Sequence, residues 1–284
     1  MYIEKQGKSF RNHKISLDKE FSSDIDYLED YYKKFMKFPL FSQVLLETRT
    51  DCNRKCVFCP QFHFERPIKI MKWNVFKKVI DELEELNFGG RIALFMTNEP
   101  LLEERLLKMI SYARNKSPRF FLDITTNGKL LTLEFLDKLL KSGVDNININ
   151  DYRSDRINRP DGISKNLIEI FQIFKNNPKI SFNKRYSKEV LSNYAGIIKE
   201  KNNQLINEFC NFPFRKLAIS ADGNIILCCN DYNYSTDFGN IIDKKIDNIW
   251  FSQDLNNFRI NLLKGIRAGL CKNCNQIQNY NVFV

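Results

Sequence analysis

The sequence predicts an α/β fold, with a parallel sheet and crossover helices followed by a smaller α+β unit. From position 41 onward, short apolar runs typical of strands alternate with amphipathic runs typical of helices. The eight cysteines fall into two groups, three between positions 52 and 59 and five after position 209, so we expect two metal sites on two structural units. The chain has 284 residues and is 43% hydrophobic, which allows one large domain or two small ones.

The runs define the order of elements in the larger unit. Strands are expected at 43–47, 91–96, 120–125, 146–150 and 180–183. Helices are expected at 73–86, 103–115, 133–142 and 165–174, each with apolar residues at helical spacing. Five strand–helix units are fewer than the eight of a closed barrel, so the prediction is an open, truncated (β/α) barrel. Its active site should lie at the carboxyl ends of the strands.

A further helix is expected before the barrel, at 25–38, where apolar residues again recur at helical spacing. We expect it to pack on the outside of the barrel, and the alternative is that it shapes the substrate pocket. The predicted organisation is an N-terminal helical extension at 1–40, a partial barrel at 41–190 and a C-terminal α+β domain at 191–284.

Three cysteines, Cys52, Cys56 and Cys59, lie in a loop directly after the first expected strand. A cubane [4Fe–4S] cluster has four irons and normally four cysteine ligands, so three thiolates leave one iron open to a small chelator. The next cysteine along the chain is Cys210, far from this loop in sequence. Zinc binding by the same three thiolates stays open as the alternative.

Charge and hydropathy exclude several other classes. The N-terminus is charged and lacks the apolar segment of a secretory signal, so we expect a cytoplasmic protein with reduced thiols rather than disulfides. No run of about 18 apolar residues is present, so no membrane association is expected. The net charge of +10 comes from Lys and Arg spread along the chain, which does not favour a nucleic-acid partner. The excess of positive charge is expected to be solvated surface charge, and the alternative is that it attracts an anionic substrate or an acidic redox partner.

The cysteine loop resembles that of the radical S-adenosylmethionine (SAM) superfamily, because its spacing is C-x3-C-x2-C and it follows a strand. The resemblance implies that the methionyl amino and carboxylate groups of SAM chelate the open iron. An electron from this [4Fe–4S] cluster would then break a carbon–sulfur bond of SAM. The resulting 5′-deoxyadenosyl radical would abstract a hydrogen atom from the substrate.

Polar residues follow the next expected strands, as they do in radical SAM enzymes. Asn98, Glu99 and Pro100 stand where the superfamily has a Gly-Gly-Glu-Pro segment that orients the amino group of SAM. Asn98 replaces a glycine there, and asparagine tolerates left-handed backbone angles. The resemblance implies that Phe58 borders the adenine. It implies further SAM contacts from Thr126, Asn127, Asn150 and Arg153.

The C-terminal unit should contain strands at 214–220 and 224–228, joined by a hairpin turn, and a helix at 247–263. That helix should carry inward the side chains of Trp250, Phe258 and Leu262. The five cysteines of this unit are enough to surround a complete cluster. Adjacent residues of a strand point to opposite faces, so only one of Cys228 and Cys229 can face that cluster. The unit resembles the SPASM/twitch kind of auxiliary-cluster domain, which implies a second [4Fe–4S] cluster on Cys210, Cys228, Cys271 and Cys274. A zinc ribbon is the alternative.

Among SPASM/twitch enzymes, the chain is similar to the 2-deoxy-scyllo-inosamine dehydrogenases, with matching segments such as Glu99-Pro-Leu-Leu102 and Leu270-Cys-Lys-Asn-Cys-Asn275. Two positions depart from them. The arginine proposed as their base is Tyr194 here, and the glutamate that holds their substrate is Asn230. We therefore expect a different substrate, with the base drawn from Tyr194, Asp231 and Tyr232.

The function predicted from this resemblance is oxidation of an alcohol to a ketone on a small polyol, sugar or aminocyclitol. The second electron would pass to the auxiliary cluster, and a flavodoxin- or ferredoxin-type protein would donate the first. Peptide modification by the same chemistry is an alternative, although the short N-terminal extension counts against it. A noncatalytic metal-binding scaffold and a nucleic-acid-modifying enzyme are the other hypotheses.

Overall fold

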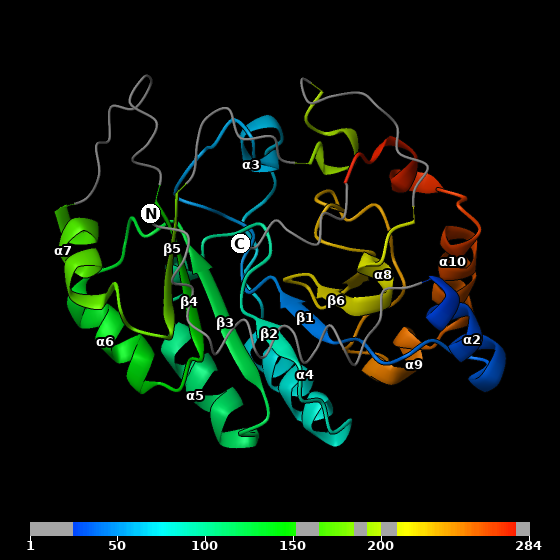
Figure 1. Cartoon of the computed structure of the whole chain (residues 1–284), viewed down its shortest axis with the longest axis horizontal. Helices are drawn as coiled ribbons and strands as arrows, with labels where there is room; N and C mark the ends of the chain where they lie inside the picture. The colour runs from blue at the N-terminus through cyan, green and yellow to red at the C-terminus, as the bar shows by residue number, and fades with distance from the viewer. Residues whose placement is uncertain (1–24, 152–164, 185–191, 200–208, 277–284) are drawn as a thin grey trace.

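The computed structural model describes residues 25–151, 165–184, 192–199 and 209–276 of the chain. Its strands are β1 (Gln43–Leu46), β2 (Arg91–Ala93), β3 (Phe121–Thr126), β4 (Asn146–Asp151), β5 (Ile180–Lys184), β6 (Lys216–Ile219) and β7 (Ile225–Ile226). They form one sheet in the order β5-β4-β3-β2-β1-β6-β7 (Figure 1). All neighbours are parallel except β6 and β7. Among the described strands β5 and β7 form opposite edges, so the sheet is open, as predicted.

Four crossover helices cover one face of this sheet (Figure 1). They are α4 (Trp73–Glu85), α5 (Leu106–Lys116), α6 (Leu133–Lys141) and α7 (Lys165–Phe174). Three of them match the predicted bounds to within one residue. The fourth, α5, begins later than expected because a 3-10 turn, η1 (Pro100–Leu102), precedes it, and the Glu103 carboxylate accepts a hydrogen bond from the backbone N–H of Arg105 at 3.0 Å.

The two faces of the sheet differ in polarity. In β4 the fully buried Ile147 and Ile149 pack in the main core with residues of α5 and α6. The intervening Asn148 instead accepts hydrogen bonds from Ser181 and Asn183 of β5. A parallel sheet that packs apolar layers on both faces has strands that are continuously apolar, so the alternation in β4 indicates that the face away from the helices is polar there.

The N-terminal helix α2 (Ile25–Phe35) packs in a different place from the one predicted. Its buried Leu28 belongs to a small core with Phe38, Phe214 and Leu262. The rings of Phe38 and Phe214 meet edge to face, with centroids 5.0 Å apart. This helix therefore lies against the C-terminal part of the chain, beside α10 (Gln253–Leu263), and not on the crossover helices (Figure 1).

The C-terminal part continues the sheet. Strand β6 pairs with β1 in parallel, and the predicted hairpin joins β6 to β7. The expected strand at 214–220 is shorter at its start because α8 (Phe212–Arg215) precedes β6. The single helix expected at 247–263 is wrong: α9 (Ile246–Trp250) ends before α10 begins, since the Ser252 hydroxyl accepts from the N–H of Leu255 and caps a new helix. Trp250 and Leu262 are buried, as predicted.

The domain boundary at 190 stays a prediction, because residues 185–191 lie outside the described residues.

Candidate active site

The first group of cysteines lies between β1 and α3 (Pro60–His63), at the carboxyl edge of the sheet. All three thiols are free and partly exposed. Burial raises the pKa of Cys52 to about 11 and that of Cys59 to about 12, and the nearby Cys56 adds to both shifts. Thiols with such pKa values are neutral at pH 7 unless a cation stabilises the thiolate, so the loop suits a metal centre.

The loops after β2 and β3 meet at Glu99. This carboxylate is 2% exposed and accepts hydrogen bonds from the N–H of Leu101 (3.0 Å), the hydroxyl of Thr126 (2.6 Å) and the N–H of Asn127 (2.8 Å). Burial raises the pKa of Glu99, and these hydrogen bonds oppose that shift. Asn127 also lies at the cysteine loop, where its side-chain amide donates to the sulfur of Cys52 at 3.7 Å. The structure therefore brings the three predicted loops together.

Asn98 differs from the expectation based on left-handed backbone angles. It is not among the described residues with positive φ. Its side-chain oxygen instead accepts from the N–H of Met96 at 2.9 Å. Its buried amide nitrogen has no hydrogen-bond partner among the described residues, so one donor is available for a ligand carboxylate or carbonyl. Pro100, Phe58 and Asn150 are also buried at this edge, and Arg153 lies outside the described residues.

The second group of cysteines converges from three segments of the C-terminal part. Cys210 precedes α8, Cys228 follows β7, and Cys271 and Cys274 lie in and just after η3 (Gly269–Asn273). All four are buried free thiols. Burial raises the pKa of Cys271 to about 12, and the nearby Cys210 and Cys274 raise it further. The same causes, burial first and then neighbouring cysteines, raise the pKa of Cys228.

A single metal ion and a cubane cluster require different arrangements of cysteine thiols. Among the described residues, no three His, Cys, Asp or Glu side chains are arranged to hold one metal ion. A cubane does not require such an arrangement, because each of its irons takes one cysteine. The choice between Cys228 and Cys229 remains a prediction, since Cys229 is half-buried and also lies near Cys274.

Two of the three candidate bases are engaged in other contacts. The carboxylate of Asp231, 2% exposed, accepts from the backbone and hydroxyl groups of both Ser235 and Thr236. The hydroxyl of Tyr232 donates to the carbonyl of Phe64 at 3.2 Å, and its side chain is buried. In this structure both residues hold loop segments together, and their role as bases stays a prediction. Tyr194 is half-buried at the start of η2 (Tyr194–Gly196), with a positive φ of 46°.

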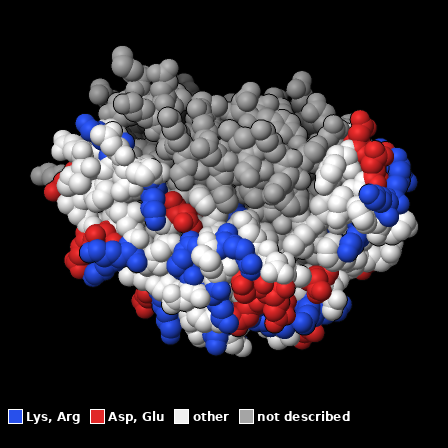
Figure 2. Space-filling view, turned by 60° about the horizontal axis from the view of Figure 1, so that its bottom comes forward, with Lys and Arg blue, Asp and Glu red and all other residues white. Residues whose placement is uncertain are grey.

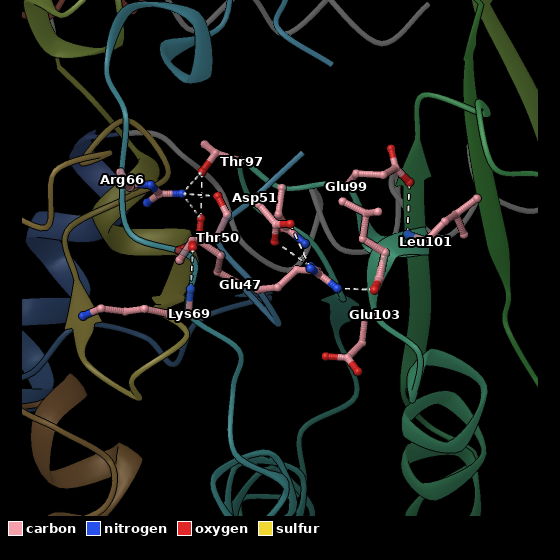
Figure 3. A network of polar contacts seen from close by, with 12 residues as sticks. Glu47, Thr50, Asp51, Arg66, Lys69, Thr97, Glu99, Leu101 and Glu103 are labelled. Atoms are coloured by element: carbon pink, nitrogen blue, oxygen red, sulfur yellow. Dashed lines mark hydrogen bonds and ion pairs between the residues drawn. The ribbon is translucent and has the colours of Figure 1, made fainter. Parts of the chain in front are cut away.

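A buried ion pair at the same edge was missed by the sequence analysis. Arg66, in the segment after the third cysteine, lies 2.7 Å from the carboxylate of Glu47 at the end of β1. Thr97 and Thr50 also contact this arginine (Figure 3). The signal available in the sequence was a charged residue, Glu47, directly after an apolar strand.

The surface carries mixed charges. Figure 2 shows a face on which basic and acidic side chains are interspersed. On α4 and its surroundings they pair, as in Lys78–Glu82 and Lys245–Glu85. None of the helices in the described part of the chain is both long enough and apolar enough to cross a membrane.

Comparison with known proteins identifies the class to which this fold and site belong. Residues 46–181 match the radical SAM superfamily, and residues 210–275 match the iron–sulfur cluster-binding domain called SPASM. The chain is a radical SAM enzyme with a C-terminal SPASM domain. These domains bring a SAM-binding [4Fe–4S] cluster and an auxiliary iron–sulfur cluster.

Among its relatives is the S-adenosyl-L-methionine-dependent 2-deoxy-scyllo-inosamine dehydrogenase of Niallia circulans. It is 29% identical over 242 residues, which are 84% of this chain and 94% of that protein. The crystal structure of BtrN in complex with AdoMet and 2-DOIA superposes with a TM-score of 0.75 at 28% identity, covering 84% of this chain and 95% of BtrN. SuiB of Streptococcus suis bound to SAM shares the fold, with a TM-score of 0.54 at 15% identity over 89% of this chain and 78% of SuiB.

Proposed function

We propose that this enzyme oxidises an alcohol carbon of a small polyol, sugar or aminocyclitol to a ketone. The observation that carries the proposal is the match to a dehydrogenase over most of both chains, together with two groups of cysteines, one after β1 and one around the β6–β7 hairpin. When bound, SAM at the first cluster supplies a radical that removes one hydrogen atom from the substrate, and the second cluster accepts the remaining electron. The proton of the hydroxyl group must pass to a base, so the ketone forms by loss of two electrons and two protons in total.

The chain's own residues would hold and enclose these groups. Cys52, Cys56 and Cys59 would bind the first cluster, and the edge formed by Glu99, Thr126 and Asn127 would receive SAM. The polar face of the sheet, with Asn148 and Ser181, lies where hydroxyl groups of a substrate would find hydrogen-bond partners. Tyr194, Asp231 and Tyr232 stay the candidate bases.

The substrate is expected to differ from an aminocyclitol in charge. Asn230 stands where the similar dehydrogenases have a carboxylate, and its amide is 4% exposed and donates to the sulfur of Cys274 at 3.7 Å. A neutral amide cannot pair with an ammonium group as a carboxylate can. We therefore propose neutral polyols or sugars as the first compounds to test. A flavodoxin- or ferredoxin-type protein is the proposed electron donor.

The test is anaerobic reconstitution, iron analysis and incubation of the reduced enzyme with SAM and candidate substrates. We expect about eight irons per chain from two cubanes. We also expect 5′-deoxyadenosine and a product two mass units lighter than its substrate, with scyllo-inositol and 2-deoxy-scyllo-inosamine as the first pair. A Cys271→Ala/Cys274→Ala variant should still release 5′-deoxyadenosine without forming the ketone, whereas Cys229→Ala should behave as the wild type. About four irons in the wild type, or SAM that stays intact, would contradict the proposal.

A further inference from the structure

The guanidinium of Arg66 is buried where three loops meet at the carboxyl edge of the sheet. Its side chain is 6% exposed, and that of its partner Glu47 is fully buried. One terminal nitrogen of Arg66 lies 2.7 Å from the Glu47 carboxylate and also donates to the carbonyl of Thr50 at 3.2 Å and the hydroxyl of Thr97 at 3.1 Å (Figure 3). Thr50 begins the cysteine loop, and Thr97 precedes Asn98 and Glu99. Arg66 therefore contacts both loops that would hold SAM and its cluster.

The other terminal nitrogen of Arg66 faces the C-terminal part of the chain. It donates to the carbonyl of Tyr232 at 3.0 Å, and the guanidinium carbon lies 3.8 Å from the centroid of that tyrosine ring. The ring of Tyr234 is 5.0 Å away, and its hydroxyl donates to the carboxylate of Glu47. Both tyrosines belong to the loop that follows Cys228. The same cation is thus shared between the first cluster loop and the auxiliary-cluster loop.

The geometry requires an arginine rather than any cation. The planar guanidinium presents donors in a fixed fork and stacks on aromatic faces, whereas a lysine ammonium is a point charge that cannot do both. An isolated buried charge is costly unless it is paired and hydrogen-bonded, and here Glu47 and the backbone carbonyls supply those partners. The contacts therefore fix three backbone segments relative to one another.

A second ion pair joins the same two parts of the chain and offers a matched comparison. Lys69, three residues after Arg66, pairs with Asp222 in the β6–β7 turn, and the two side chains are 43% and 42% exposed. Exposed pairs of this kind contribute little to stability. Removing this pair tests whether any link between the segments is sufficient, or whether the buried arginine is required.

We infer that Arg66 is a positioning residue that sets the SAM-cluster loop, the SAM-binding loop and the auxiliary-cluster loop relative to one another. The inference rests on the proposed function, because it takes the residues of these loops to hold the cofactors. Without this arginine, the loop after Cys228 loses its hydrogen bond and ring contact with Arg66, and Glu47, which accepts from Tyr234, loses its cationic partner. SAM binding and the order of that loop should then change together.

The test compares reconstituted Arg66→Lys and Arg66→Gln holoenzymes with wild type and Lys69→Gln. Two measurements need no substrate: the SAM concentration that half-saturates the EPR change of the reduced first cluster, and hydrogen–deuterium exchange over residues 228–236. We expect both Arg66 variants to need about tenfold more SAM and to exchange at least about tenfold faster in that segment. Lys69→Gln should stay within about twofold of wild type in both.

Unchanged SAM binding together with unchanged exchange in either soluble Arg66 variant would overturn the inference, and so would an equal effect of Lys69→Gln. If neither Arg66 variant folds, Tyr234→Phe takes their place, since it removes only the hydroxyl that contacts Glu47. Faster exchange over 228–236 in Tyr234→Phe supports the inference, and wild-type exchange there overturns it. Because neither readout involves a substrate, an error in the proposed substrate class would leave these results standing.

Discussion

The side-chain amide of Asn230 donates to the sulfur of Cys274 at 3.7 Å, in a site where both residues are buried. Hydrogen bonds to cysteine sulfurs are among the factors that set the reduction potential of an iron–sulfur cluster. Such a donor stabilises the reduced, more negative cluster and so raises its potential. Asn230 thus donates to a residue that we propose as a ligand of the auxiliary cluster.

Asn230→Ala should therefore lower the midpoint potential of the auxiliary cluster without changing the iron content. A redox titration followed by EPR measures this shift. Asn257→Ala, at an exposed position of α10, is the control and should leave the potential unchanged. A potential that rises or stays constant in Asn230→Ala would show that this hydrogen bond does not tune the cluster.

The barrel could be predicted from the sequence because its signals are local. The runs around β1 to β5 alternate with amphipathic helices, and the structure places each strand within three residues of its predicted ends. The element against which α2 packs was predicted wrongly, because the signal for this contact is not local. An amphipathic pattern shows that Leu28 is buried, but it does not show against which element.

The site was predictable only where a motif marks it. The first three cysteines and Glu99 belong to short sequence motifs in loops that follow strands, and the structure brings those loops together at one edge of the sheet. Arg66 has no such mark, because its partners lie between 16 and 166 residues away along the chain. Asp231 was one of three candidate bases, and nothing in the sequence indicated that Ser235 and Thr236 donate hydrogen bonds to its two oxygens.

The buried carboxyl of Glu99 predicts a pH-dependent stability in the protein without SAM. Burial raises the pKa of Glu99 above its ordinary value, so the folded protein binds this proton more tightly than the unfolded chain does. Its contribution to stability is therefore fully present below the unfolded pKa and is lost as the pH rises through the folded pKa.

In Glu99→Gln the group cannot ionise, so this pH dependence should disappear. The melting temperature of the variant relative to wild type should increase between pH 4 and pH 8, whatever constant offset the lost hydrogen bonds cause. Thermal melts across this range measure the difference. Glu104→Gln, at an exposed position, serves as the control. A flat difference for Glu99→Gln would mean that the pKa of Glu99 is not raised.

Two adjacent glycines before β2 should respond differently to alanine. A side-chain carbon at Gly90 would overlap the carbonyl oxygen of Ser42 and lie 2.6 Å from the ring of Phe88, whereas one at Gly89 would meet only Arg119, at 3.9 Å. Overpacking of this kind typically costs about 1–3 kcal/mol. Gly90→Ala should therefore lower the melting temperature by at least about 2 °C, and Gly89→Ala should leave it nearly unchanged. Equal melting temperatures for the two variants would contradict the tight contact between β1 and β2.

The buried guanidinium of Arg259 should stabilise the junction between α9 and α10. It donates to the carbonyls of Pro213 at 2.9 Å and Trp250 at 2.7 Å, and its carbon lies 3.8 Å from the centroid of the Trp250 ring. Arg259→Met keeps much of the apolar stem but leaves two buried carbonyls without this donor, at about 1–3 kcal/mol each. We expect a total loss of about 2–6 kcal/mol, seen as a lower urea midpoint, with Lys264→Met at the exposed end of the helix as the neutral control. Since burial lowers the pKa of Arg259, an unchanged or higher midpoint would mean that burying this charge costs as much as its hydrogen bonds contribute.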